Sequence, residues 1–194
     1  MGKVVYWMTV SLDGFVETRE GHIDWGMPDE GLFRFLTDYA RQLGAFLYGR
    51  RTYQLMADFW PTAGLDPSAP ERVGELGPEL VAEFARVWRA KPKVVFSRTL
   101  GSVEHNSRLA REDVAVEVAR TKQEVQGDLG VCGPTLASAF MQRGLIDEYR
   151  LFVRPIVLGG GKPYFAALDR PVALRLAETR TFPGGVVLLR YERA

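Results

Sequence analysis

The apolar positions of this 194-residue chain form short runs separated by segments with helical spacing. Two runs rich in Val and aromatic residues, 3–10 and 93–97, are typical of buried strands, and 45–48 is a third. In 29–43 the apolar residues recur every three or four positions, which predicts a helix with Gly44 as its C-terminal cap. Strand and helix therefore alternate from the start of the chain.

The rest of the chain continues this alternation. We expect helices over 52–59, 78–88 and 135–143, and strands over 129–132, 148–153, 156–158, 173–181 and 186–191. The segment 113–125 alternates Val like a strand, but its charged end favours a helix, which we predict. Residues 11–24 and 61–78 are expected to be loops, and 183–185 a hairpin turn. The predicted fold is α/β, a three-layer α-β-α sandwich. Its sheet is mixed, mostly parallel, with a C-terminal antiparallel hairpin, in one domain of residues 1–194.

Composition narrows the classes of protein. Hydrophobic residues make up 46% and charged residues 25%, as in an ordinary globular protein, and the net charge of +1 argues against broad nucleic-acid binding. Cys132 is the sole cysteine, so no intrachain disulfide is possible. No apolar run approaches the roughly 20 residues of a membrane helix, and the N-terminal run is short for a signal peptide. We expect a cytoplasmic protein that does not bind membranes.

Polar residues follow three of the predicted strands where each one ends. These strand ends are Gly49-Arg50-Arg51-Thr52, Ser97-Arg98-Thr99 and Cys132-Gly133-Pro134-Thr135. The carboxyl ends of parallel strands meet at one edge of a sheet, where helix N-termini and arginine forks suit phosphates. Thr52 and Thr135 stand where a hydroxyl either caps its helix or contacts a phosphate. The pattern therefore predicts a phosphate-binding edge.

Common alternatives lack their motifs. No G-x-G-x-x-G follows a strand, the 161–163 stretch lacks the other residues of a P-loop, and there is no G-x-S-x-G. The two histidines, His22 and His105, are far apart and no cysteine pair exists, which argues against zinc. Cys132 in its apolar strand is better explained as a small core residue than as a nucleophile.

Four stretches together resemble the dihydrofolate reductase-like superfamily: MTVSLDGFV, LYGRRTYQLM, VVFSRT and GVCGPTLASAFMQRGLIDEYRLFVRPIVLGGGKPYF. The best match is the branch related to the reductase half of the bifunctional riboflavin-biosynthesis deaminase-reductase, from Val4 to Tyr191. The resemblance implies an NADPH-dependent reductase on a mixed sheet flanked by helices. It also implies a homodimer, for which the C-terminal hairpin is a plausible interface.

The resemblance assigns the strand ends to NADPH. Gly49-Arg50-Arg51-Thr52 resembles the turn whose arginine meets the 2′-phosphate and whose threonine meets the pyrophosphate. Ser97-Arg98 resembles the second wall of the 2′-phosphate pocket, and Gly133-Pro134-Thr135 the glycine turn under the pyrophosphate. Here Cys132-Gly133 replaces the usual Gly-Gly pair. Alternatively, Gly133 only forms a tight turn between the strand and the helix.

The resemblance also places residues near the reacting centre. Thr9 and Asp13 resemble residues at the nicotinamide end, although Asp13-Gly14 is also a common turn former. The stretch WGMPDEGLF resembles the segment with the single active-site carboxylate of dihydrofolate reductase, which places that group at Glu30, beside Asp29 as helix cap. A buried Glu30 would have a raised pKa and would suit proton donation, but first-turn acids are also common for dipole reasons. Gly160 and Gly161, in the run 159–161, either let backbone N–H groups meet a substrate phosphate or form a flexible strand crossover.

Three functions are compared. The first is an NADPH-dependent reductase of a pteridine-like or riboflavin-pathway aminopyrimidine substrate. The second is a nucleotide-binding module that has lost turnover, and the third is a purely structural subunit. The chain has neither the H-x-E nor the P-C-x-x-C of the companion deaminase, so we expect a free-standing reductase.

Overall fold

The computed structural model describes residues 2–65, 76–165 and 167–194. The chain divides into two compact units, which are described in turn. Unit 1 comprises Met1–Gly2 and Pro28–Gly130, and unit 2 comprises Lys3–Met27 and Val131–Ala194. Part of the predicted 61–78 loop, residues 66–75, lies outside the described residues.

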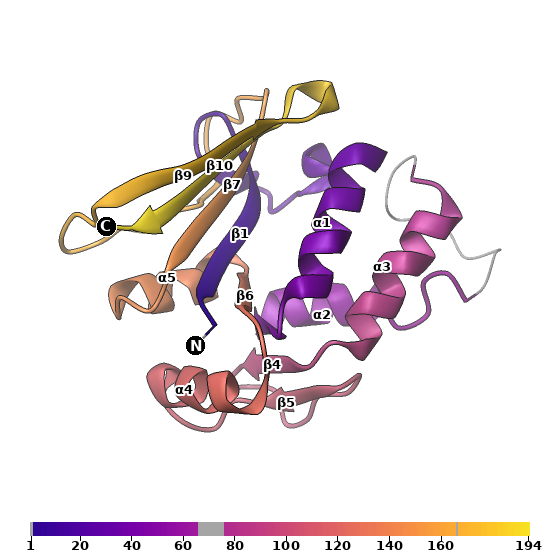
Figure 1. The fold of residues 1–194 in the computed structure, drawn as a ribbon, viewed down its shortest axis with the longest axis vertical. Helices are drawn as coiled ribbons and strands as arrows, with labels where there is room; N and C mark the ends of the chain where they lie inside the picture. Colours follow the sequence, from indigo (N-terminus) through magenta and orange to yellow (C-terminus); the bar gives the residue numbers. More distant parts are fainter. Residues whose placement is uncertain (1, 66–75, 166) are drawn as a thin grey trace. The chain divides into compact units, whose positions relative to one another are not determined.

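Unit 1 contains a parallel group of three strands, in the order β5-β4-β3. The strands are β3 (Ala45–Gly49), β4 (Lys93–Phe96) and β5 (Ser107–Leu109), and the helices are α1 (Glu30–Gln42), α2 (Arg50–Phe59), α3 (Pro78–Ala90) and α4 (Val114–Glu124). Helices α1 and α3 lie side by side (Figure 1). Their apolar faces meet in an aromatic cluster in which Phe84 lies 5.6 Å from Phe33 and 4.4 Å from Trp60 between ring centroids.

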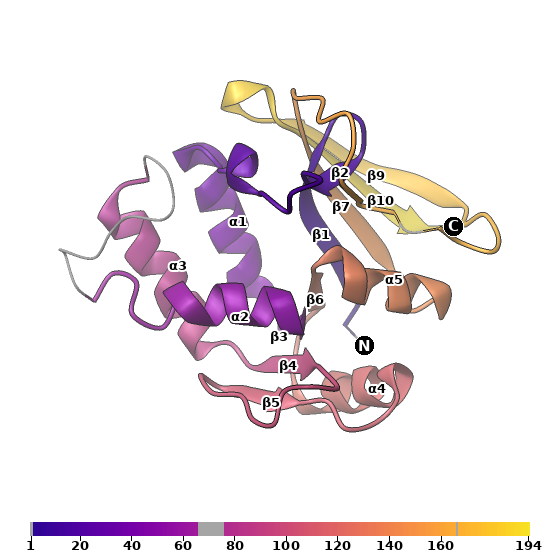
Figure 2. The same ribbon diagram turned by 180° about the vertical axis from the view of Figure 1, so that it is seen from behind.

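Unit 2 contains a mixed group of four strands, in the order β1-β7-β10-β9. Its strands are β1 (Val4–Ser11), β7 (Glu148–Arg154), β9 (Leu174–Thr181) and β10 (Val187–Arg193). Strands β1 and β7 are parallel, whereas β10 is antiparallel to both β7 and β9 (Figure 2). A short antiparallel pair joins β2 (Phe15–Glu17) to β8 (Lys162–Pro163), and helix α5 (Pro134–Gln142) follows strand β6 (Leu129–Cys132), which begins in unit 1. Single 3-10 turns lie at η1 (Asp24–Gly26) and η2 (Pro183–Gly185).

Most predicted elements are confirmed. The 113–125 segment is helical, with the Asp113 carboxylate accepting from the N–H of Ala115 as its cap. Pro78 opens α3 at its first position, and the 183–185 turn joins the antiparallel hairpin. The fold is α/β with a C-terminal antiparallel hairpin, as predicted.

Three details of the prediction are wrong. Residues 156–158 are not a strand, because the N–H of Leu158 binds a side chain instead of a ladder partner. Gly44 is not a left-handed helix cap; α1 ends at Leu43 in extended backbone, and a Cβ on Gly44 would overlap the carbonyl oxygen of Gln126. The short strands β2 and β5 were not predicted, since three residues carry too little pattern.

No helix in the described ranges is both long and apolar enough to span a bilayer.

Candidate functional site

The end of β3 leads directly into α2 without a side-chain cap. Gly49 is the N-cap residue, in extended backbone with φ −77° and ψ 166°, and no side chain caps the first turn. Helix α2 begins two residues earlier than predicted, so Thr52 lies inside the first turn and does not cap it. The capping explanation of Thr52 is therefore wrong, and the helix start carries Arg50 and Arg51 on exposed positions.

The strand ends of β3 and β4 bring Arg50 to Thr99. The two strands are parallel, with Gly49 opposite Phe96, so the residues that follow them lie side by side. The Arg50 Nη1 lies 3.4 Å from Thr99 Oγ1, and the hydroxyls of Thr99 and Ser97 are 3.5 Å apart. Unit 1 therefore gathers a guanidinium and two hydroxyls at one point, as the strand-end argument predicts.

Ser97 also shapes the turn that follows β4. Its Oγ accepts hydrogen bonds from the N–H groups of Thr99, at 3.2 Å, and Leu100, at 3.0 Å. Arg98, between them, is exposed. The sequence analysis gave Thr99 no ligand role. Its place in the strand-end triplet Ser97-Arg98-Thr99 was the feature that could have indicated one.

The turn from β6 into α5 depends on Gly133. Its φ is +102°, a conformation that strains any residue with a Cβ, and it is the N-cap of a helix with Pro134 at its first position. No side chain caps this helix, so Thr135, which is exposed, does not act as the cap. The Gly133 N–H points to the sulfur of Met8 at 3.4 Å, a weak acceptor that a stronger one can displace.

Cys132 precedes this turn. Burial raises the pKa of its thiol far above the usual value, which keeps the sulfur protonated and unreactive. The prediction of a small core residue fits this environment better than a nucleophile does. Because α5 still starts on Gly133, Cys132 alters only the preceding position of the usual Gly-Gly pair.

Asp13 fastens one loop of unit 2 to another. Its carboxylate accepts from the Ser11 hydroxyl at 2.7 Å and from the N–H groups of Leu158, at 3.1 Å, and Gly159, at 2.7 Å. These hydrogen bonds, the one from Ser11 first, hold the pKa of Asp13 below its usual value. An ionised carboxylate only accepts hydrogen bonds, so Asp13 is suited to holding the loop and not to donating a proton. Gly14, at φ +90°, completes the predicted Asp-Gly turn.

The two acidic residues at the start of α1, Asp29 and Glu30, have different surroundings. Asp29 is the N-cap, with Oδ1 accepting from the N–H of Leu32 at 2.8 Å, as predicted. The Glu30 side chain is 60% exposed, and its carboxylate lies 3.9 Å from the guanidinium of Arg34. The expected burial of Glu30 is therefore wrong. Glu30 lies in the first turn of α1.

The glycine run 159–161 has a structural explanation. A Cβ on Gly161 would overlap the carbonyl oxygen of Glu17, and one on Gly160 would overlap the Arg19 guanidinium. Arg19 in turn donates to the carbonyl of Gly159 at 3.0 Å. The run therefore packs tightly against β2; contact with a substrate and flexibility of the crossover both stay predictions.

Thr9 lies in β1, half-buried, opposite Phe152 of β7. Its methyl group packs against Gly26, where a Cβ would come within 3.3 Å. Among residues 2–65, 76–165 and 167–194, no three His, Cys, Asp or Glu side chains lie close enough to hold a metal ion.

Comparison with known proteins agrees with this architecture. A family model described as the RibD C-terminal domain matches residues 2–188. The uncharacterized protein YyaP of Bacillus subtilis (strain 168) is 31% identical over 192 residues, covering 97% of this chain and 94% of YyaP. A second uncharacterized protein of that strain, YwjB, is 30% identical over 199 residues, covering 99% and 98%.

Two solved structures show the same fold. Acinetobacter baumannii RibD (form 2) superposes with a TM-score of 0.69 at 20% identity, covering 100% of this chain and 58% of that one. Dihydrofolate reductase from Enterococcus faecalis, complexed with NADP(H) and RAB-propyl, superposes with a TM-score of 0.64 at 12% identity, covering 99% and 96%. The fold is thus dihydrofolate reductase-like.

Proposed function

The chain belongs to the family of RibD C-terminal domains, and on that premise we propose that it is an NADPH-dependent reductase of a small heterocyclic compound. The proposed substrate class is a pteridine-like ring or a riboflavin-pathway aminopyrimidine carrying a ribityl or ribosyl phosphate. A Thermotoga maritima protein with this fold is a diaminohydroxyphosphoribosylaminopyrimidine deaminase/5-amino-6-(5-phosphoribosylamino)uracil reductase. This likeness supports the aminopyrimidine as the substrate class.

The observation that carries the proposal is the contact of the Arg50 Nη1 with the Thr99 hydroxyl at 3.4 Å, with the Ser97 hydroxyl 3.5 Å from that of Thr99. A guanidinium beside two hydroxyls offers several donors to one phosphate, which is the donor set that a 2′-phosphate requires. Arg98, exposed on the same turn, adds positive charge. These residues fit NADPH better than NADH, which has no phosphate at this position.

The uncapped helix starts are proposed to meet the pyrophosphate. The first turns of α2 and α5 have no side-chain cap, and their N–H groups and dipoles favour an anion. The full set proposed to hold the cofactor is Thr9, Gly49, Arg50, Arg51, Thr52, Ser97, Arg98, Gly133, Pro134 and Thr135.

At the reacting end, a bound nicotinamide supplies the hydride. Glu30, at an exposed position, is proposed as the proton donor. Asp13, held ionised, is proposed to position the 158–159 loop beside the substrate. Asp29, Gly160 and Gly161 are proposed to line the substrate side.

The test is the thermal unfolding midpoint with NADPH and with NADH. A ligand that binds only the folded protein at about 100 times its dissociation constant adds roughly 2.7 kcal/mol, which is easily seen. We expect a clear NADPH shift that Arg50→Ala reduces, with little change for NADH. Arg120→Ala is the matched control, because it removes an exposed arginine whose partner is Glu124 on α4. Equal losses for both cofactors in Arg50→Ala would reject the 2′-phosphate assignment.

One observation keeps a second function open. The two carboxylates assigned to the chemistry are an exposed Glu30 and an ionised, loop-binding Asp13. A nucleotide-binding module without turnover would bind NADPH and oxidise none of it across a panel of folate and riboflavin-pathway intermediates. A purely structural subunit would show no shift with either cofactor.

The oligomeric state and the cellular location of the protein are further parts of the proposed function. We propose a cytoplasmic homodimer, for which β9 at the sheet edge presents Leu176, 51% exposed. Light scattering of the purified chain tests the dimer; a monomer at working concentration would reject it.

A further inference from the structure

The segment 97–106 joins β4 to β5 and begins with the two hydroxyls of the proposed phosphate pocket. Near its other end, Tyr53 of α2 holds one residue through both backbone groups. The N–H of Glu104 donates to the Tyr53 hydroxyl oxygen at 2.8 Å, and that hydroxyl donates to the Glu104 carbonyl at 3.3 Å. Tyr53 is 7% exposed, so its ring is packed and its hydroxyl is fixed in place. Helix α2 therefore carries both Arg50 and the anchor of this segment.

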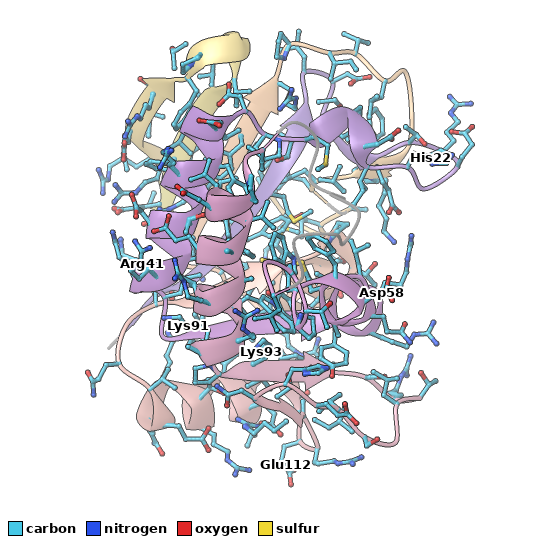
Figure 3. All side chains as sticks on the ribbon, turned by 90° about the vertical axis from the view of Figure 1, so that its right-hand side faces the viewer. His22, Arg41, Asp58, Lys91, Lys93 and Glu112 are labelled. Atoms are coloured by element: carbon cyan, nitrogen blue, oxygen red, sulfur yellow. The ribbon has the colours of Figure 1, made fainter. Side chains whose placement is uncertain are left out.

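A second anchor acts beside the first. The Lys93 ammonium donates to the carbonyls of His105 and Lys91, each at 2.8 Å, and lies 4.2 Å from the centroid of the Trp88 ring. Figure 3 labels Lys91 and Lys93, which follow the C-terminal end of α3. His105 and Asn106 are both left-handed, with φ of 60° and 56°, a costly conformation without glycine. The surrounding contacts therefore impose this shape on the segment.

We propose that Tyr53 is a positioning residue for the phosphate pocket. Its hydroxyl fixes the 97–106 segment on α2, and so keeps Thr99, with Ser97 beside it, in contact with Arg50. The inference rests on the proposed function, because it concerns the same pocket. NADH has no 2′-phosphate, so a displaced segment lowers the affinity for NADPH and leaves that for NADH unchanged.

The test compares Tyr53→Phe with Glu104→Ala at pH 7. Tyr53→Phe removes only the hydroxyl and keeps the packed ring. Glu104→Ala is the matched control, because Tyr53 binds the backbone of Glu104, whose side chain is 82% exposed. Two quantities are measured: hydrogen exchange of the 97–106 amides without cofactor, and the dissociation constants of NADPH and NADH.

We expect faster exchange of these amides in Tyr53→Phe and an NADPH dissociation constant about ten-fold higher, because the N–H of Glu104 loses its hydroxyl acceptor. In Tyr53→Phe, the NADH dissociation constant and the exchange rates outside the segment should change less than about two-fold. In Glu104→Ala, all of the measured quantities should change less than about two-fold, because the hydrogen bonds to Tyr53 remain. Lys93→Met releases the neighbouring anchor and should act in the same direction, which covers the case that Tyr53→Phe does not fold. Burial lowers the pKa of Lys93 to about 8, so its ammonium is charged at the assay pH.

The outcomes separate the two levels of the proposal. A wild-type protein that binds NADPH and NADH alike overturns the phosphate pocket and the role of Tyr53 with it. A wild-type protein that prefers NADPH, together with a Tyr53→Phe variant that keeps the same preference, overturns the positioning role alone. Faster exchange with an unchanged preference also rejects that role, since Tyr53 would then only stabilise the loop.

Discussion

The carboxylate of Asp13 lies 2.7 Å from the backbone nitrogen of Gly159, a residue 146 positions further along the chain. This contact joins two loops of unit 2 and, with Ser11, keeps Asp13 ionised. We therefore expect Asp13 to act by holding the 158–159 loop in position.

Replacing Asp13 separates holding from proton donation. Asp13→Asn keeps an acceptor oxygen, so we expect most of the loop contact and much of any turnover to survive. Asp13→Ala removes every acceptor, so the amides of 158 and 159 should exchange faster and turnover should fall further. Steady-state kinetics and hydrogen exchange of both variants check this. Equal and complete loss of turnover in both variants would instead identify Asp13 as the proton donor.

The glycine run provides a stability test with a matched pair. At Gly161, with φ +142°, a Cβ would collide with the Glu17 carbonyl, so we expect Gly161→Ala to lower the free energy of unfolding by roughly 3 kcal/mol. At Gly159, with φ +70°, nothing lies within 4 Å, so Gly159→Ala should cost only about 1 kcal/mol of conformational strain. Urea unfolding measures both, and similar values would show that the crossover does not pack as tightly as described.

Glu148 in β7 predicts a dependence of stability on pH. Its side chain is 1% exposed and contacts Lys3 at 3.0 Å, Arg150 at 2.6 Å and Arg190 at 3.2 Å. Burial alone would raise the pKa of Glu148, but these cations lower it below the usual value near 4.5. A lowered carboxyl pKa stabilises the folded state above the unfolded value, and this contribution is lost as the pH falls through the folded value.

We therefore expect Glu148→Gln to lower the free energy of unfolding at pH 7 by about 2 kcal/mol, because it removes the buried carboxylate that Lys3, Arg150 and Arg190 contact. The difference from wild type should shrink below about pH 4. Glu178→Gln is the control, since Glu178 is 39% exposed and its pair with Arg190 should contribute about 0.5 kcal/mol. Urea unfolding across this range checks the prediction; a pH-independent difference would contradict the titration of Glu148.

The sequence predicted best what depends on neighbours along the chain. The Val-rich run of β1, Pro78 at the start of α3 and the 183–185 turn follow from local preferences. The meeting of Arg50 with Thr99, which Ser97 contacts in turn, was also predictable, because parallel pairing places successive strand ends together. By contrast, the exposure of Glu30 and the close approach of Gly161 to Glu17 depend on which elements pack against them. No local sequence pattern predicts these contacts. The close approach of Gly44 to Gln126 likewise depends on packing between segments that are distant in the sequence.

The pairing of β1 with β7 has a consequence for how the protein is made. The N–H of Val4 binds the carboxylate of Asp147, 143 residues later, and the two strands pair along their lengths. On the ribosome, β1 emerges with its apolar side chains long before its parallel partner β7 has been made. Such distant pairing slows folding, so refolding yield should depend on protein concentration, with the unpaired β1 as the segment that aggregates.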